Sequence, residues 1–277
     1  AWATEMKFAE LPLQDTLGCI LAHSVRHADG VFKKGRKLAA DDLKLLAASG
    51  VSKIFVAKLD ADDVPEDEAA RAIAGKVAGS GATAQEPFTG RSNVYAQQRG
   101  LVVVDSLRVN AINRVHESMT LATLPNYHVV DKGQMIATIK IIPFAVNKEN
   151  LDKALAKIGT TPVIRVQVLA EKRVGLVITK VAGSKQSLIE KSETAMRERV
   201  KALGSDLVQV RVCDHSIEAV RTSVTELEAL SCNPILLFGA SAIVDREDVI
   251  PAGLSAAGGT VVHLGMPVDP GNLMMLG

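Results

Sequence analysis

The feature that most constrains the fold is a short continuous apolar run at residues 174–179, which opens a regular alternation of strand and helix patterns. A run of this length is typical of a strand that is buried on both faces of its sheet. Further strands are predicted at residues 207–212, 234–238 and 260–264, and residues 273–276 could pair back. Strands that alternate with helices imply right-handed crossovers and parallel pairing. We therefore predict an α/β fold whose C-terminal domain has three αβα layers and a mostly parallel sheet.

Helix signals lie between these strands. A capping-box pattern that begins at Ser187 predicts a helix over residues 187–203. Asp214 or Ser216 is expected to cap a second helix, and a third is predicted over residues 248–257 before a pair of glycines.

The N-terminal part has a different pattern. At 277 residues the chain is long enough for two domains, and we place them at residues 1–170 and 171–277. The first is expected to be an α+β region. Its predicted helices cover residues 38–49, 64–77, 105–118 and 149–158. Strands are predicted at residues 51–56, and over residues 120–124 and 129–146 around turns at Pro125-Asn126 and Asp131-Lys132-Gly133.

Composition excludes several classes of protein. The net charge of +1 and the 3% aromatic content give no basic face or stacking surface for nucleic acid. No apolar stretch is long enough to span a membrane. Three scattered cysteines, Cys19, Cys213 and Cys232, favour a reduced, cytoplasmic protein without a disulfide framework. Residues 1–5 lack the charged and apolar regions of a signal peptide.

Two loops are candidate ligand sites on physical grounds alone. Ligands of parallel sheets bind beyond the carboxyl ends of the strands, where residues 180–186 and 239–247 follow the first and third predicted strands. Both loops contain small residues and lead into helices, so a ligand could approach free backbone N–H groups. Neither loop matches a Walker A or dinucleotide-binding glycine motif.

The second loop also carries the acids Asp245, Glu247 and Asp248. Carboxylates would repel a phosphorylated ligand unless a divalent cation such as Mg²⁺ stood between them. The same acids are also typical of a helix start, with Asp245 as the N-cap and Glu247 and Asp248 in the first turn, where the positive end of the helix dipole favours them. Spacing alone favours the capping role.

These segments resemble the molybdenum-cofactor biosynthesis (molybdopterin-binding) domain family. In that family a strand and a glycine-rich turn precede an acidic segment that opens a helix. Residues 188–192 and 214–219 match other helix starts of the family, and residues 258–271 resemble the strand and turn that follow. Segments 11–22 and 34–51 resemble the opening of molybdopterin molybdotransferases. The signature itself is carried by Phe238-Gly239-Ala240-Ser241-Ala242 and Asp245-Arg246-Glu247-Asp248-Val249-Ile250-Pro251.

The resemblance implies a cytoplasmic protein that binds molybdopterin or the molybdenum cofactor. The reaction it implies is adenylylation or molybdate insertion, with Asp245 and Asp248 as magnesium ligands and catalytic groups and Glu247 assisting. A homo-oligomer is expected, with a nucleotidyltransferase domain or a molybdoenzyme as partner. The residues implied to bind the pterin or its phosphate are Gly183, Ser184, Ser192, Gly239, Ala240, Ser241 and Ala242.

The sequence departs from the family pattern in three places. Alanines replace glycines at positions 240 and 242, and each added Cβ restricts positive φ. The loop after the first strand lacks the family's acid, and the later glycine-proline loop is absent from residues 1–277. These departures favour a non-catalytic carrier or docking module for a nucleotidyltransferase. An unrelated nucleotide-binding α/β domain is the third alternative. His215 and His263 are expected to be an exposed residue and a sheet residue, respectively.

Overall fold

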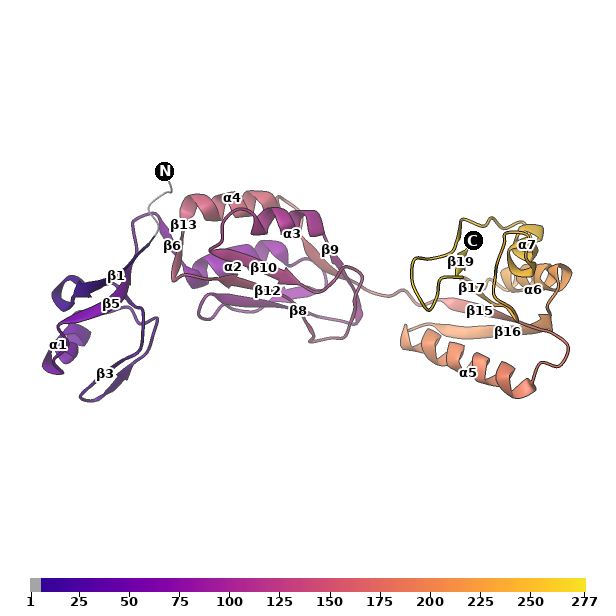
Figure 1. Ribbon diagram of the computed structural model, residues 1–277, viewed down its shortest axis with the longest axis horizontal. Helices are drawn as coiled ribbons and strands as arrows, with labels where there is room; N and C mark the ends of the chain where they lie inside the picture. The colour runs from indigo at the N-terminus through magenta and orange to yellow at the C-terminus, as the bar shows by residue number, and fades with distance from the viewer. Residues whose placement is uncertain (1–5) are drawn as a thin grey trace. The chain divides into compact units, whose positions relative to one another are not determined.

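The computed structural model describes residues 6–277, so the predicted absence of a signal peptide at residues 1–5 lies outside the described residues. The chain forms two compact units that divide between Val168 and Leu169, whereas the sequence placed the boundary after residue 170. Figure 1 shows both, and each is described on its own. The mixed α/β class expected from the sequence is confirmed, and most strand pairs are antiparallel. No helix of the described chain is long and apolar enough to cross a membrane.

The first part of unit 1 is a small antiparallel sheet covered by one helix. The strand order is β1-β5-β2. Leu21, Leu46 and Val56 are fully buried between the sheet and the helix, because alternate strand residues face the same side. The elements are β1 (Lys7–Pro12), η1 (Leu13–Asp15), β2 (Ile20–Leu21), β3 (Val25–His27), β4 (Gly30–Phe32), α1 (Ala40–Ala48) and β5 (Lys53–Lys58).

The rest of unit 1 packs three helices against antiparallel sheets with orders β10-β12-β8-β7 and β11-β9-β14, and a two-stranded β13-β6 pair. One continuous apolar core joins them, in which Ile73, Ile139 and Ile158 are buried. The elements are β6 (Asp63–Pro65), α2 (Glu66–Val77), β7 (Ala82–Ala84), β8 (Arg91–Ala96), β9 (Gly100–Val104), α3 (Ser106–Asn113), β10 (Met119–Thr123), β11 (Val129–Val130), β12 (Met135–Ile141), β13 (Ala145–Asn147), α4 (Lys148–Ile158) and β14 (Ile164–Gln167).

One predicted helix of unit 1 is shorter than the sequence pattern suggested. The helix predicted to residue 118 ends at Asn113, whose side chain donates to Leu121 O and accepts from Leu121 N–H. These bonds turn the chain into β10. The turn predicted at residues 131–133 is confirmed, with Gly133 at a φ of 83°, and the strands predicted over residues 129–146 are β11, β12 and β13.

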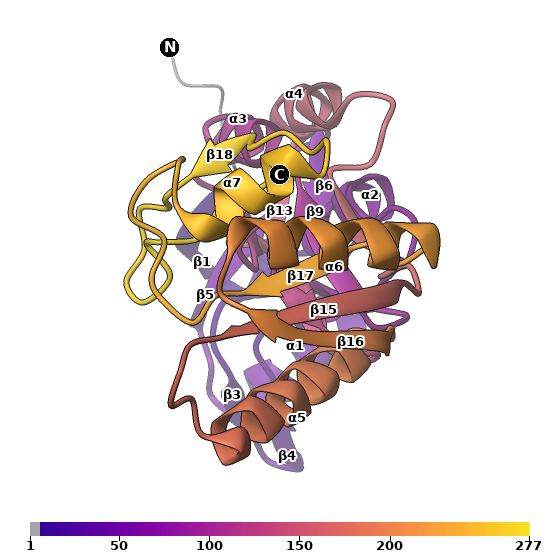
Figure 2. The ribbon, with the colours of Figure 1, turned by 90° about the vertical axis from the view of Figure 1, so that its right-hand side faces the viewer.

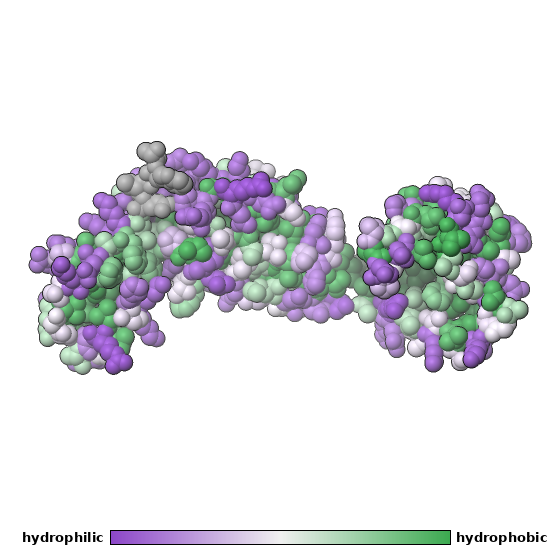
Figure 3. Space-filling model, in the orientation of Figure 1, coloured by the Kyte–Doolittle hydropathy of each residue, from purple (hydrophilic) through white to green (hydrophobic). Residues whose placement is uncertain are grey.

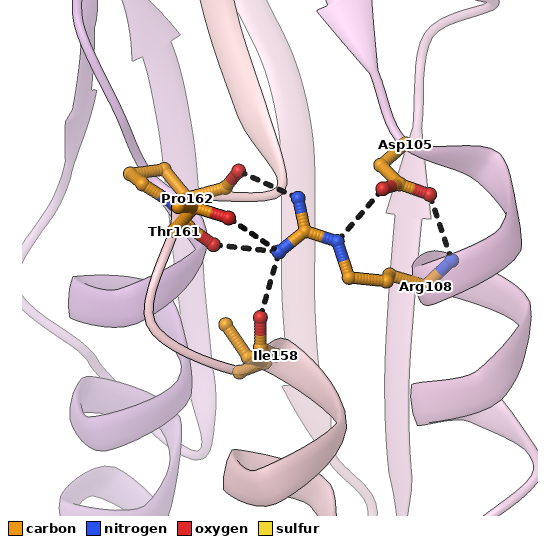
Figure 4. A network of polar contacts seen from close by, with 5 residues as sticks. All are labelled: Asp105, Arg108, Ile158, Thr161 and Pro162. Atoms are coloured by element: carbon orange, nitrogen blue, oxygen red, sulfur yellow. Dashed lines mark hydrogen bonds and ion pairs between the residues drawn. The ribbon is translucent and has the colours of Figure 1, made fainter.

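A network of polar contacts links the start of α3 to other segments of unit 1 (Figure 4). Asp105 accepts the backbone N–H of Arg108 as the helix cap and also accepts the Arg108 side-chain Nε–H at 2.8 Å. The same guanidinium donates to the carbonyls of Ile158, Thr161 and Pro162. These bonds from Arg108 hold the pKa of Asp105 below its ordinary value. One side chain thus ties α3 to the end of α4 and to the segment before β14.

Unit 2 contains the parallel sheet. Its order is β16-β15-β17, and β15 pairs parallel with both neighbours. Val174, Leu176 and Ile178 pack against α5, whereas Val177 packs with Leu227 of α6 on the opposite face (Figure 2). The elements are β15 (Arg173–Lys180), α5 (Gln186–Ala202), β16 (Asp206–Asp214), α6 (Ile217–Ala229), β17 (Ile235–Phe238), α7 (Val249–Ala256), β18 (His263–Leu264) and β19 (Met275–Leu276).

Two predictions for unit 2 are wrong in detail. The fourth strand, predicted at residues 260–264, does not join the parallel sheet. Only His263–Leu264 forms a strand, and it pairs antiparallel with Met275–Leu276 after a turn that contains Gly271. The prediction that residues 273–276 pair back is thus confirmed. The capping box at Ser187 does not form either. Helix α5 begins one residue earlier, after Lys185.

Candidate functional site

The carboxyl end of the parallel sheet is a topological switch point. The chain passes from β15 to β16 on one side of β15, and then returns through α6 to β17 on the other side. The loop after β15 enters α5 on one face of the sheet, and the loop after β17 enters α7, which packs with α6 on the other face. Loops that diverge in this way leave a crevice at the strand ends, where open α/β sheets bind ligands.

Three polar side chains meet at this edge. Thr179, near the end of β15 and only 4% exposed, lies with its Oγ1 2.9 Å from His215 Nδ1. Ser241 Oγ lies 3.0 Å from the other ring nitrogen, Nε2. Thr179 Oγ1 also accepts the Ala240 N–H at 2.8 Å. Side chains that follow β15, β16 and β17 are therefore joined in one hydrogen-bonded chain, which we call the Thr179–His215–Ser241 relay.

The loop after β15 is held by its own turn. The Ser184 hydroxyl accepts the Val181 N–H at 3.0 Å, and the Ser184 N–H donates to Val181 O. Gly183 takes a φ of 84°, a left-handed conformation that favours glycine. The N-cap residue of α5 is Lys185, which has no side-chain oxygen and makes no capping hydrogen bond.

The loop after β17 is compact at its first residue. A Cβ on Gly239 would lie 2.9 Å from Ser241 O and 3.3 Å from Ile250, so no larger residue fits without movement. Neither Ala240 nor Ala242 has a positive φ, so the two alanines carry no backbone strain. Across residues 6–277, the backbone N–H groups of Ser241, Ala242 and Ile243 have no hydrogen-bond acceptor.

Two of the three acids of this loop, Asp245 and Asp248, accept hydrogen bonds from backbone N–H groups. Asp248 is the N-cap of α7 and accepts from Val249 N–H at 2.7 Å, with a longer bond of 3.3 Å from Val244 N–H. Asp245 accepts from Glu247 N–H at 2.8 Å. The N-cap is therefore Asp248, whereas the capping interpretation of the sequence placed Asp245 there, with Glu247 and Asp248 in the first turn. Within the described part of the chain, no three His, Cys, Asp or Glu side chains are grouped so that they could hold a metal ion.

A groove of about 1460 Å³ runs along the outer edge of β17 to this site. Its walls include all of β17, Ser241 and Ala242, Ile250 of α7 and the C-terminal segment 271–277. The four β17 residues are apolar, yet none is fully buried, and Phe238 is 44% exposed. Figure 3 shows apolar residues gathered on the visible face of unit 2. A ligand at the strand ends would thus have an apolar surface beside it.

Unit 1 has a smaller cavity of about 560 Å³ that no sequence pattern predicted. Glu66 lies there with Lys140 Nζ at 3.9 Å, and Lys34 Nζ lies 5.4 Å from the centre of the Phe144 ring. Burial raises the pKa of the Glu66 carboxyl, and the nearby Lys140 opposes that shift. The cavity is lined by charges of both signs and belongs to a different unit from the predicted site residues.

The structure brings some predicted site residues together and leaves others apart. Ser241 belongs to the relay, and Gly239 and Ala242 line the adjoining groove. Gly183 and Ser184 lie in the loop after β15. Ser192 lies farther along α5, and its hydroxyl donates to Leu188 O within the helix.

His215 was expected to be only an exposed residue, whereas it is half-buried and bonded on both sides. Its position directly after β16 was the signal that could have identified it, because the carboxyl ends of parallel strands meet at one edge of the sheet.

Comparisons with known proteins leave this site without a described counterpart. A family model described as a Domain of unknown function (DUF8806) matches residues 10–58, which lie in unit 1. No curated protein matches the chain. The chain is similar to a solved structure of the nicotinate-nucleotide pyrophosphorylase from Francisella tularensis, at 11% sequence identity and a TM-score of 0.22, covering 72% of this chain and 91% of that one. At that TM-score the likeness carries no weight for fold or function.

Proposed function

We propose that unit 2 binds molybdopterin or the molybdenum cofactor at the carboxyl end of its parallel sheet. The observation that carries this proposal is the meeting of residues from β15, β16 and the loop after β17 at the switch point, beside an apolar groove. We further propose that residues 171–277 are the three-layer αβα domain that the resemblance implies. A pterin is flat and largely apolar at its faces, and its phosphate needs hydrogen-bond donors, so both parts of the site are suited to it.

The residues present are compatible with a magnesium ion at the acidic loop. Asp245 has one carboxylate oxygen, Oδ2, without a partner within residues 6–277, and Asp248 Oδ2 makes only the long bond to Val244 N–H. Carboxylates of this kind are the oxygen ligands that Mg²⁺ prefers together with phosphate. Asp245 and Asp248 would hold the ion, which would offset their repulsion of the phosphate, and Glu247 would assist. Ser184, Ser192 and Ser241 are the proposed pterin or phosphate contacts.

A carrier without catalysis is the second candidate function. It is favoured by the use of both aspartates as backbone acceptors, since a helix cap needs no chemical role. In that case the unit would hold the cofactor for a nucleotidyltransferase domain or a molybdoenzyme.

A binding and turnover experiment tests the proposal. The purified chain is titrated with molybdopterin, with and without Mg-ATP and molybdate, while binding and product formation are measured. Asp248→Ser is the informative variant, because serine keeps the helix cap and removes the carboxylate. The exposed helical Ser255→Ala serves as a control.

Turnover that Asp248→Ser abolishes and Ser255→Ala retains supports an enzyme. Tight binding without turnover supports the carrier. No binding of molybdopterin by the wild-type chain contradicts both.

A further inference from the structure

The Thr179–His215–Ser241 relay contains a residue that the proposed function does not assign, His215. Its anchor is Thr179, whose hydroxyl is buried at the end of the central strand and accepts the Ala240 N–H at 2.8 Å. A hydroxyl has one proton to donate. The two available acceptors are His215 Nδ1 at 2.9 Å and Phe238 O at 3.5 Å. The shorter contact is the hydrogen bond, because 3.5 Å is at the limit for an O–H donor.

This choice fixes the tautomer of neutral His215. If Nδ1 accepts from Thr179, the ring proton is on Nε2, and Nε2–H donates to Ser241 Oγ at 3.0 Å. We assign these proton positions from the hydrogen-bond network. Ser241 makes no other side-chain bond within residues 6–277, so its own hydroxyl proton remains available to a ligand.

We propose that His215 is a positioning residue that makes the loop after β17 an array of hydrogen-bond donors for the phosphate group of a phosphorylated ligand. The array consists of the Ser241 hydroxyl and the backbone N–H groups of Ser241, Ala242 and Ile243. The Ala240 N–H is already satisfied by Thr179, which fixes the start of the loop. The inference rests on the proposed location of the ligand site. It adds His215 as the residue that orients the donors of that site.

The same geometry argues against a role of Ser241 and His215 in nucleophilic catalysis. A serine beside a histidine is also the arrangement of nucleophilic catalysis, in which the imidazole accepts the hydroxyl proton. Here Nε2 carries a proton and donates to Ser241, so it is not a base for that hydroxyl. Among residues 6–277, no carboxylate contacts Nδ1, whose partner is the Thr179 hydroxyl.

The charge around the array needs a compensating element. Asp245, Glu247 and Asp248 follow in the same loop and oppose an anion. The partners of Asp245 and Asp248 are backbone N–H groups, while Arg246 donates to Val261 O. Directed hydrogen bonds must therefore supply much of the phosphate affinity in the absence of Mg²⁺. This makes binding sensitive to the loss of a single donor.

The first test is a direct measurement of the His215 tautomer. Long-range ¹H–¹⁵N NMR spectra of the wild-type chain are recorded at about pH 8, where an imidazole is ordinarily neutral. We expect a protonated Nε2 and an unprotonated Nδ1. An unprotonated Nε2 would overturn the proposal, because His215 would then accept from Ser241. This measurement needs no variant and is independent of folding effects.

The second test is a titration with inorganic phosphate, followed through the amide signals of residues 241–243. We expect saturable shifts in the wild-type chain and about five- to tenfold weaker binding in His215→Ala and Thr179→Val, as for the loss of one hydrogen bond. His215→Gln should recover much of the affinity, because its terminal amide nitrogen can still donate to Ser241. The exposed His263→Ala is the matched control and should bind phosphate as the wild type does. Amide spectra of each variant check that unit 2 remains folded.

The outcomes separate this inference from the proposed function. Phosphate binding that depends on His215, without any molybdopterin binding, would retain the donor array and refute the cofactor. Molybdopterin binding of wild-type strength in both His215→Ala and Thr179→Val would refute the positioning role and leave the cofactor proposal standing. Hydrolysis of an activated acyl ester that is lost in both Ser241→Ala and His215→Ala would overturn the donor assignment in favour of nucleophilic catalysis.

Discussion

The two units of this chain bury their sheets in different ways. In residues 63–167 of unit 1, antiparallel strands and three helices enclose one continuous core, and the side chains of β12 that face it are almost completely buried. In unit 2, the central strand β15 is buried on both faces, but its neighbour β17 is apolar and only half-buried. The apolar side chains of unit 2 form three smaller clusters.

This difference suggests that the polar groups of unit 1 serve stability, whereas those of unit 2 serve ligand binding. The polar network of unit 1, centred on Arg108, satisfies backbone carbonyls and holds three segments together. The polar relay of unit 2 lies at the strand ends, beside an open groove and free backbone N–H groups. Groups at the end of a parallel sheet are rigidly placed without being enclosed, which suits a binding site.

The largest expected contrast is between core residues of the two sheets. Ile139→Ala removes a fully buried side chain from β12 and should lower the free energy of unfolding of unit 1 by about 3–4 kcal/mol. Leu237→Ala in β17 should lower that of unit 2 by only about 1–2 kcal/mol, because the leucine is half-buried. Urea unfolding followed by hydrogen exchange of peptides from each unit measures both. Equal losses would contradict the comparison.

Replacing Arg108 tests the network of unit 1. Arg108→Ala should destabilise unit 1 by about 2–3 kcal/mol, because it removes several charge-assisted hydrogen bonds to fixed carbonyls. Arg108→Lys should recover little, since an ammonium group cannot reproduce the planar fork of donors. The exposed Arg165→Lys in β14 is the conservative control. Full recovery of the urea midpoint by Arg108→Lys would show that charge alone is sufficient.

Two helical glycines give a matched pair across the units. A Cβ on Gly253 of α7 would lie 2.6 Å from Val220 of α6, so Gly253→Ala should cost unit 2 about 1–3 kcal/mol of unfolding free energy. A Cβ on Gly75 of α2 meets nothing within 4 Å, so Gly75→Ala should stabilise unit 1 by about 0.5–1 kcal/mol. Thermal unfolding measures both, and the same sign for the two variants would contradict the packing described here.

The smallest expected effect is a pH dependence in unit 1. Because Arg108 lowers the pKa of Asp105 in the folded state, the charged carboxylate stabilises folding above its unfolded-state pKa of about 3.9. That stability is lost as the pH falls through the lower, folded-state value. Asp105→Asn should therefore reduce the urea midpoint of unit 1 at about pH 7, and the difference from wild type should narrow below about pH 4.

Asp206→Asn, in unit 2, is the control for that measurement. A gap between the wild type and Asp105→Asn that is constant with pH would mean that the charge of Asp105 plays no part.

Sequence patterns predicted single helices and strands better than they predicted which elements contact one another. The apolar run of β15 and the glycine-terminated helix α4 follow from periodicity and from the left-handed residue Gly159, which act within a few residues. The helix over residues 105–118 was predicted too long, because Asn113 forms bonds with Leu121, a contact that periodicity does not register. The placement of the strand predicted at residues 260–264 was wrong for a similar reason. Its apolar pattern fitted a parallel sheet, but residues 263–264 pair with β19 instead.

The sequence by itself determined that strands and helices alternate after residue 172 and that small and acidic residues follow the third strand, because hydrophobic period and turn chemistry are local properties. The tertiary structure decided the strand order β16-β15-β17 and, with it, the meeting of Thr179, His215 and Ser241. Those residues are far apart in the chain, and only the crossovers that bring three strand ends to one edge place them within hydrogen-bond distance.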